Sequence, residues 1–211
     1  DHALSGTAAT GGFAGATLTQ TIRFGVARGL FSNESGLGSA PIAAAAARTN
    51  HPAKQALVSM TGTFLDTLIV CSLTAIVLTT TGVWTTGETG VALTLRAFVA
   101  AYPGYGVGSI VSITVITFAF STILAWEYYG EKCFEFIFGV RYIEFYRIIW
   151  VIFVFIGSVI KLDLVWNFSD AMNALMAVPN LLGLIWLSET LVRGTRTFED
   201  DTQSRSLNKV N

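Results

Sequence analysis

Long apolar stretches alternate with short polar segments along most of the chain, and this pattern predicts several membrane-spanning helices. A helix needs about 20 mostly apolar residues to cross the hydrocarbon layer of a bilayer. Four stretches fit such spans, at about 56–81, 107–126, 145–160 and 164–191. Polar segments separate them: 48–55, 82–108, the mixed polar and aromatic segment 127–147, and 161–163. We predict loops there, with a short amphipathic helix at 93–101 lying over the bundle.

The first apolar stretch, at about 11–47, differs because polar residues and glycines interrupt its middle. The interrupting residues are Gly25, Arg28, Gly29, Ser32, Asn33, Glu34, Ser35, Gly36, Gly38 and Pro41. Glycine weakens a helix and proline removes a hydrogen-bond donor. We therefore predict a broken first span, with a half-helix at 11–27, an unwound turn at about 29–36 and a second half-helix after it.

An unwound turn inside a membrane exposes two helix ends to each other. The first half-helix would end with free carbonyl groups, which attract a cation or an ammonium group. The second would begin with free N–H groups, which attract an anion. Such paired ends are typical of sites for ions and small zwitterions at the membrane midplane.

Three further groups of polar residues lie inside the apolar spans. Asp66 is predicted either to bind a cation or a proton, or to be a structural hydrogen-bond acceptor between helices. Ser121 and Thr122 offer oxygen ligands for sodium, although such hydroxyls commonly bond to their own helix. Asn167, Asp170 and Asn173 share one helix face. Asp170 is a candidate gate residue that would pair with Arg23 or Arg28.

The composition narrows the class of protein. The chain has 211 residues, of which 52% are hydrophobic and 13% charged, and its mean hydropathy is +0.58. These values are typical of a multi-pass helical membrane protein and not of a soluble domain. The net charge of −1 argues against nucleic-acid binding. Cys71 and Cys133 have no metal-site spacing, and we predict no disulfide between them.

Lysine and arginine residues predict the orientation of the spans. The segment 48–55, the segment 127–147 and the tail 193–211 carry most of them, whereas the opposite side has only Arg96 and Lys161. Positive loops face the cytoplasm. Residues 1–10 are then extracellular or periplasmic, the transmembrane domain covers 11–192, and 193–211 forms a disordered cytoplasmic tail.

Several segments resemble the alanine/glycine:cation symporters, also called sodium:alanine symporters. They cover most of the chain from Gly11 to about Val192, and the most specific is Gly25-Val-Ala-Arg-Gly-Leu-Phe-Ser-Asn-Glu-Ser-Gly-Leu-Gly-Ser-Ala-Pro41. The others are Gly11-Gly-Phe-Ala-Gly-Ala16, Phe64-Leu-Asp66, Phe120-Ser-Thr122, Trp126-Glu-Tyr-Tyr-Gly-Glu131, Leu164-Val-Trp-Asn-Phe-Ser-Asp170 and Pro179-Asn-Leu181. Glu127 departs from the family, in which a serine is frequent at this position.

The resemblance implies an all-α membrane protein that forms the C-terminal five-helix inverted repeat of a leucine-transporter-like fold. The implied function is sodium-coupled symport of alanine or glycine by alternating access in a bacterial cytoplasmic (inner) membrane. The resemblance implies a sodium site at Ser121 and Thr122. We expect the substrate site to include Gly29, Phe31, Ser32, Asn33, Glu34 and Trp126, with Arg28, Asp66, Asn167 and Asp170 in gates or polar networks. No cofactor other than the coupling sodium ion is expected.

The chain opens on Asp1 without an initiator methionine, so we expect a fragment that lacks the N-terminal half of the transporter. The expected partners are that half, the lipid bilayer, sodium and the amino acid. A channel or a non-transporting membrane scaffold is the alternative function. An enzyme is the least favoured class, because the sequence shows no nucleophile–base pair and no metal cluster.

Overall fold

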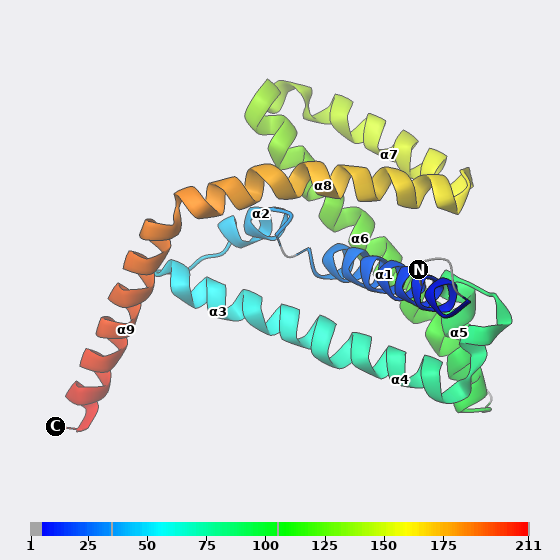
Figure 1. The fold of residues 1–211 in the computed structure, drawn as a ribbon. Helices are drawn as coiled ribbons and strands as arrows, with labels where there is room; N and C mark the ends of the chain where they lie inside the picture. Colours follow the sequence, from blue (N-terminus) through cyan, green and yellow to red (C-terminus); the bar gives the residue numbers. More distant parts are fainter. Residues whose placement is uncertain (1–5, 35, 105, 211) are drawn as a thin grey trace.

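Helices make up nearly all of the computed structural model, which describes residues 6–34, 36–104 and 106–210 (Figure 1). In chain order the elements are α1 (Gly6–Asn33), α2 (Ala40–Ala45), α3 (Pro52–Thr63), the π-helix η1 (Phe64–Cys71), α4 (Ser72–Thr81), the short η2 (Val83–Thr86), α5 (Gly90–Ala101), α6 (Val107–Phe138), the short η3 (Val140–Tyr142), α7 (Ile143–Val159), α8 (Leu162–Trp186) and α9 (Ser188–Val210). No strand occurs in these ranges. The predicted all-α class is confirmed.

Four continuous helical segments among the described residues are long and apolar enough to cross a membrane. They are Pro52–Thr81, which joins α3, η1 and α4; Val107–Phe138; Val140–Val159; and Leu162–Trp186. Each overlaps one of the four uninterrupted spans that the sequence predicts. The interrupted first span predicted at about 11–47 is not among them, because the polar residues of α1 lower its hydropathy. The short helix expected at 93–101 is also confirmed, as α5.

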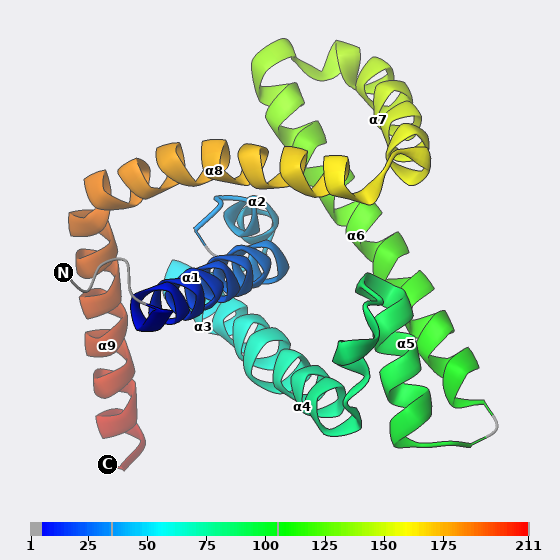
Figure 2. The same ribbon diagram turned by 45° about the vertical axis from the view of Figure 1, so that its right-hand side comes forward.

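The helices are arranged in an open way around α1. In both views α1 lies between the long rod of α3, η1 and α4 on one side and α8 on the other (Figures 1 and 2). The helices α6 and α7 form an antiparallel pair, and α9 turns away from α8 to pass the start of α3 (Figure 2). Within the described residues only Leu37, Val83 and Ala97 are buried apolar side chains. Most apolar faces therefore remain open to lipid or to other protein.

The position of the break in the first span requires a correction. We predicted an unwound turn at about 29–36, but α1 continues through Asn33 and the interruption lies at 34–39. A single glycine costs a helix only about 1 kcal/mol. The polar residues Ser32 and Asn33 find hydrogen-bond partners on the neighbouring helix. The helix therefore has no reason to unwind at Gly29.

The predicted loop at 127–147 is wrong for most of its length. The helix α6 continues to Phe138 and ends at Gly139, which has a φ of 81°. The carboxylates of Glu127 and Glu131 stand one helical turn apart and both face Arg147 of α7. These ion pairs let a polar segment continue as a helix and pack on its neighbour. The next span accordingly begins at Ile143 and ends at Val159.

The last span and the tail also differ from their prediction. The span expected at 164–191 ends earlier, at Trp186. The helix α9 covers Ser188–Val210 and so includes residues 193–210 of the expected disordered tail. Glu189 and Arg193 form an ion pair one turn apart on α9. Phe198 packs against His51, the residue that precedes α3. Both contacts stabilise a helix that composition alone does not predict.

Candidate functional site at the interrupted helix

The interruption between α1 and α2 is built from three residues in the left-handed backbone region. Glu34 has a φ of 57°, Gly36 of 82° and Gly38 of 84°. The backbone N–H of Glu34 still bonds to the carbonyl of Leu30, at 3.0 Å, and closes the last turn of α1. A non-glycine residue in this backbone region is uncommon and marks a position held by its surroundings. The break is therefore a defined structure within the fold.

Asn180 of α8 holds the break in place. Its side-chain amide donates to the carbonyl of Gly36 at 3.0 Å. A Cβ added at Gly38 would lie only 3.1 Å from the Oδ1 atom of Asn180. A side chain at Gly38 would therefore require Asn180 to shift by a few tenths of an ångström. Sequence reasoning missed Asn180, although a lone amide after Pro179 in an apolar helix was a visible signal.

Glu34 and Ser39 close the break from within. The Ser39 hydroxyl donates to the Glu34 carboxylate at 2.7 Å, so it does not cap α2. Ser39 is almost fully buried, and Leu37 beside it is buried too. Tyr129 of α6 lies within electrostatic range of Glu34. The break therefore places one carboxylate beside the ends of two helices.

An ion pair links α1 to α8 on one side of the break, as predicted for Arg28 and Asp170. The Nη2 atom of Arg28 lies 2.8 Å from Oδ1 and 2.6 Å from Oδ2 of Asp170. The guanidinium also stacks on the ring of Trp166, at 4.0 Å from its centroid. Phe31 meets the same ring edge-on, with the centroids 5.4 Å apart. Trp166 thus orders two expected site residues, a role that sequence reasoning missed.

Two hollows border this ion pair. One of about 890 Å³ lies between α1, α5 and α8, and Arg28, Trp166, Asn167 and Asp170 are among its lining residues. A smaller one of about 210 Å³ is lined by Arg23, Asp170 and Asn173, among others. The predicted polar face of α8 is therefore confirmed. Arg23 shares the smaller hollow, but Asp170 forms its ion pair with Arg28.

The last turn of α1 is joined to the π-helix η1 by polar contacts. The Ser32 hydroxyl donates to the Asp66 carboxylate at 2.9 Å. The Asn33 amide donates to the Thr67 hydroxyl, and the Thr63 hydroxyl donates to the Asn33 oxygen at 3.4 Å. Two expected site residues, Ser32 and Asn33, thus contact an expected network residue, Asp66. π-Helical turns are frequently found at functional sites.

The remaining expected site residues lie on α6, which contacts α2. The Ser121 hydroxyl donates to the carbonyl of Phe118 in its own helix, at 2.9 Å. Both Ser121 and Thr122 are exposed in the structure. Trp126 packs edge-on against Tyr129, whereas Phe31 packs against Trp166. Gly29 lies within α1, one turn before Asn33.

A second charged cluster ties α6 to α7 and was not predicted. The Nε atom of Arg147 lies 2.8 Å from Glu131 and 3.7 Å from Glu127, and its Nη1 atom lies 3.2 Å from Glu144. The Glu131 side chain is only 10% exposed. Tyr146 packs so closely on Gly130 that a Cβ there would collide with its hydroxyl. The cluster therefore fixes the two helices in one register.

Replacing Arg147 by alanine should destabilise this pair of helices. The substitution leaves the nearly buried Glu131 carboxylate without its basic partner, and we expect a loss of about 1–3 kcal/mol in unfolding free energy. The melting temperature of the purified protein in detergent measures the loss. Arg141→Ala, at an exposed position outside this charged cluster, is the control and should change the melting temperature little. Equal melting of R147A and the parent protein would contradict the prediction.

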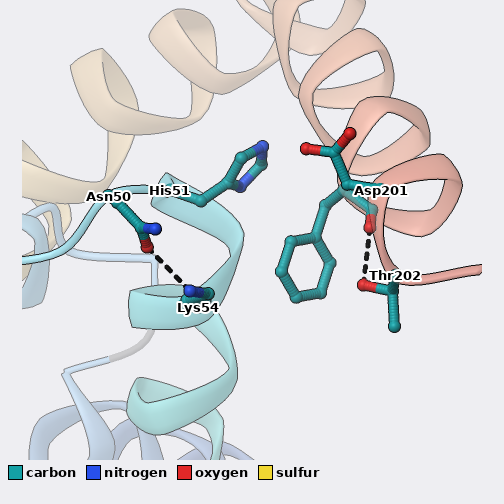
Figure 3. A pocket seen from close by; sticks show the side chains of 6 residues that line it. Asn50, His51, Lys54, Asp201 and Thr202 are labelled. Atoms are coloured by element: carbon teal, nitrogen blue, oxygen red, sulfur yellow. Dashed lines mark hydrogen bonds between the residues drawn. The ribbon is translucent and has the colours of Figure 1, made fainter. Parts of the chain in front are cut away.

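A small hollow of about 220 Å³ lies between the start of α3 and α9. Figure 3 shows Asn50, His51 and Lys54 facing Asp201 and Thr202 across it. His51 also accepts a hydrogen bond from the backbone N–H of Ala53 and so caps α3. The ring contact between His51 and Phe198 holds α9 against the start of α3.

The interrupted helix, the intramembrane ion pair and the four long apolar helices define a multi-pass helical membrane protein with a polar site inside the bundle. The chain belongs to the sodium:alanine symporter family, whose model matches residues 1–211.

Two relatives with assigned names are similar over most of the chain. It is 50% identical to the sodium/alanine symporter AgcS of Methanococcus maripaludis over 198 aligned residues. The alignment covers 92% of this chain and 43% of the relative. It is 38% identical to the probable sodium/glutamine symporter GlnT of Bacillus subtilis over 192 aligned residues. This alignment covers 90% of this chain and 39% of that protein.

An uncharacterised transporter of Haemophilus influenzae is 48% identical over 200 residues, or 94% of this chain and 44% of its own length. The chain therefore spans about two fifths of the length of the relatives it matches.

Proposed function

We propose that the transporter containing this chain couples sodium entry to the uptake of a small neutral amino acid, alanine or glycine, by alternating access. The observation that carries the proposal is the fixed interruption at 34–39, between α1 and α2. Family membership and the similarity to the sodium/alanine symporter AgcS support the same activity. In this proposal the chain forms the C-terminal five-helix repeat of a leucine-transporter-like fold. The N-terminal half supplies the remainder of the site.

The amino acid would bind at the break. The end of α1 carries a partial negative charge that attracts the ammonium group of the substrate. The Glu34 carboxylate adds to this attraction, while Phe31 limits the size of the pocket. In this proposal the substrate site comprises Gly29, Phe31, Ser32, Asn33, Glu34 and Trp126. Because GlnT is named as a probable glutamine symporter, glutamine is the competitor to test against alanine and glycine.

The ion pair between Arg28 and Asp170 would serve as a gate between the break and the larger hollow. It joins α1 to α8 directly, so the two helices separate only if it opens. The Nη1 atom of Arg28 is buried and has no hydrogen-bond partner among the described residues. A substrate carboxylate passing through the hollow could bind this atom and weaken the contact with Asp170.

The basic residues at 48–55, 127–147 and 193–211 favour a cytoplasmic location for the start of α3 and for α9, with the protein in the inner membrane. Labelling single cysteines at positions 50 and 88 from each side of sealed vesicles tests this orientation. Position 50 should react from the cytoplasmic side and position 88 from the outside.

A transport measurement tests the proposed function. The complete transporter, reconstituted in liposomes, should accumulate labelled alanine against its gradient when sodium is high outside and should lose this activity with potassium instead. Glycine should compete more strongly than glutamine. Saturable alanine uptake that does not depend on sodium would refute the proposed sodium coupling. Unsaturable flux would favour a channel, and an absence of flux would favour a membrane scaffold.

Replacing both Ser121 and Thr122 by alanine should weaken sodium binding if their hydroxyls coordinate the ion. We expect the half-saturating sodium concentration for alanine uptake to rise by about tenfold or more, equivalent to about 1.4 kcal/mol. Thr117→Ala on the same helix is the matched control, because the Thr117 hydroxyl bonds to the carbonyl of Ile113. An unchanged sodium dependence in the double variant would reject these two residues as sodium ligands.

A further inference from the structure

The charged cluster between α6 and α7 contains more acid than base. The carboxylates of Glu127, Glu131 and Glu144 lie 3.7, 2.8 and 3.2 Å from the single guanidinium of Arg147. The Glu144 side chain is 82% exposed, so water screens its charge. The side chains of Glu127 and Glu131 are only 23% and 10% exposed. One guanidinium therefore faces two poorly hydrated carboxylates that stand one helical turn apart.

Glu127 is the less well satisfied of these two acids. Glu131 accepts a hydrogen bond from the Nε atom of Arg147 at 2.8 Å. The Oε1 atom of Glu127 lies 3.7 Å from the same nitrogen, which is too far for a hydrogen bond. This oxygen is buried and has no hydrogen-bond partner in the part of the chain that the structure describes. A buried anionic oxygen without a donor is costly, and this cost opposes ionisation of Glu127.

Glu131 also opposes a negative charge on Glu127. The two side chains lie within hydrogen-bonding reach of each other. Like charges this close disfavour each other's ionisation. A hydrogen bond between two carboxyl groups requires a proton on one of them, because an ionised carboxylate only accepts. Glu131 keeps its charge through the hydrogen bond from Arg147, so the proton belongs on Glu127.

Arg147 is the base that this pair of acids shares. The other groups that face Glu127 from α7 are the exposed carboxylate of Glu144 and the hydroxyl of Tyr146, which lies within electrostatic range of Glu127. The helix α2, which also packs against α6, has no titratable side chain. The other charged residues of α6, α5 and η3 have their own partners or are exposed: Arg96 pairs with Glu88, Lys132 pairs with Glu135, and Arg141 is exposed.

The acid pair lies close to the proposed transport site along α6. Glu127 directly follows Trp126, and it is about 8 Å from Thr122 along the helix by helical rise. A change in the packing of α6 on α7 would therefore move both of these expected site residues. The charged residues of the segment 127–147 place this end of α6 at the cytoplasmic boundary in the proposed orientation. Protons therefore reach Glu127 from the cytoplasm.

We propose that Glu127 and Glu131 form a proton-binding pair through which the transporter senses cytoplasmic pH. With the proton on Glu127, Arg147 balances the charge of Glu131 and the packing of α6 on α7 is stable. Loss of the proton to water as the pH rises leaves two carboxylates against one guanidinium, which loosens this packing and slows uptake. The proton stays with the protein and does not travel with the amino acid. This inference rests on the proposed transport function and on its orientation.

Glu127→Gln tests the pair through protein stability, because glutamine keeps the shape of the protonated acid and does not titrate. The folded protein holds the proton more tightly than the unfolded chain, so unfolding releases it and stability falls as the pH rises. The melting temperature of the complete transporter in detergent should show this fall, and E127Q should lose most of it. Glu135→Gln is the matched control, because Glu135 lies on the same helix and has its own partner, Lys132. It should melt with the pH dependence of the parent protein.

Uptake measurements connect the pair to transport. The complete transporter is placed in liposomes with its cytoplasmic face inside, at fixed external pH and a fixed sodium gradient. Alanine uptake by the parent protein should fall as the internal pH rises, by at most about tenfold per pH unit, which is the limit for one proton. E135Q should follow the parent protein. E127Q should keep the rate that the parent protein has at low internal pH.

Several outcomes would overturn the inference. One is uptake by E127Q with the pH dependence of the parent protein, whatever its melting behaviour. Another is a response to external pH alone. A third is alanine accumulation driven by a proton gradient without a sodium gradient, because that result makes the proton a transported ion. A parent protein without sodium-driven uptake would instead refute the proposed function, and the melting comparison would still test the proton-binding pair.

Discussion

Alanine at Gly38 should nearly abolish alanine uptake, with a fall of about 100-fold, because it displaces the break by a fraction of an ångström to about 1 Å. The φ of 84° at this position disfavours any side chain. The added Cβ would also press on Asn180 at 3.1 Å. Asn180 would then have to release the carbonyl of Gly36, which it holds at 3.0 Å. We expect an accompanying loss of about 1–3 kcal/mol in stability.

Gly25→Ala is the matched control for this substitution. Gly25 lies within α1, outside the proposed substrate site, and a Cβ added there meets nothing within 4 Å. Alanine should therefore support the helix, by up to about 1 kcal/mol, and leave uptake close to that of the parent protein. The comparison uses initial rates of labelled alanine uptake in liposomes with equal amounts of each protein. Normal uptake by G38A, or an equal loss of uptake in G25A and G38A, would contradict the prediction.

The second large effect concerns the ion pair between α1 and α8. Asp170→Asn leaves the Arg28 guanidinium without a carboxylate inside the membrane, and Arg28→Ala leaves Asp170 without a cation. Both side chains are about one-third exposed, so the cost of the unpaired charge is below that of a fully buried pair. We expect each single substitution to reduce the rate of uptake by about 10- to 100-fold. The uptake rate of the Arg28→Lys variant should lie between those of the parent protein and of Arg28→Ala. Lysine keeps the positive charge but cannot bind both carboxylate oxygens from a planar group stacked on Trp166.

The pair of Arg96 and Glu88 provides the matched control. Its nitrogen–oxygen distance is 2.6 Å, the same as for Arg28 and Asp170, but Arg96 is half exposed and Glu88 precedes the short helix α5. Exposed pairs contribute about 1 kcal/mol or less, so E88Q should transport almost normally. The Arg28→Asp, Asp170→Arg exchange should recover part of the lost rate if the pair itself matters. Normal transport by D170N would show that the contact is structural and does not gate.

Local patterns along the chain were enough to predict several features of the fold. The four uninterrupted spans followed from apolar length, and α5 followed from a short apolar segment in a polar loop. An ion pair of Asp170 with Arg23 or Arg28 was also predicted, because opposite charges inside apolar spans each need a partner, and the structure shows that the partner is Arg28. The resemblance carried by Gly25 to Pro41 predicted the family that the comparisons then confirmed.

Errors arose where a contact between distant residues outweighed the local pattern. The polar composition of 127–138 predicts a loop. The segment is helical in the structure because Arg147 pairs with two of its carboxylates. The tail reads as disordered, but Phe198 packs on His51 and α9 forms. The pattern of polar residues placed the start of the break about five residues too early, because Ser32 and Asn33 have partners on η1 that the linear sequence does not show.

The sequence by itself determined the class of protein, the number of long apolar spans, the family and the presence of an interruption in the first span. These features depend on apolar length and on residue types that a helix in lipid cannot accommodate without a partner. Only the tertiary structure decided where the helix stops, since Asn180 fixes Gly36 and Gly38 from another helix. It also decided that Trp166 orders Arg28 and that Asp66 meets Ser32. Such choices depend on distances between residues far apart in the chain, which no local pattern encodes.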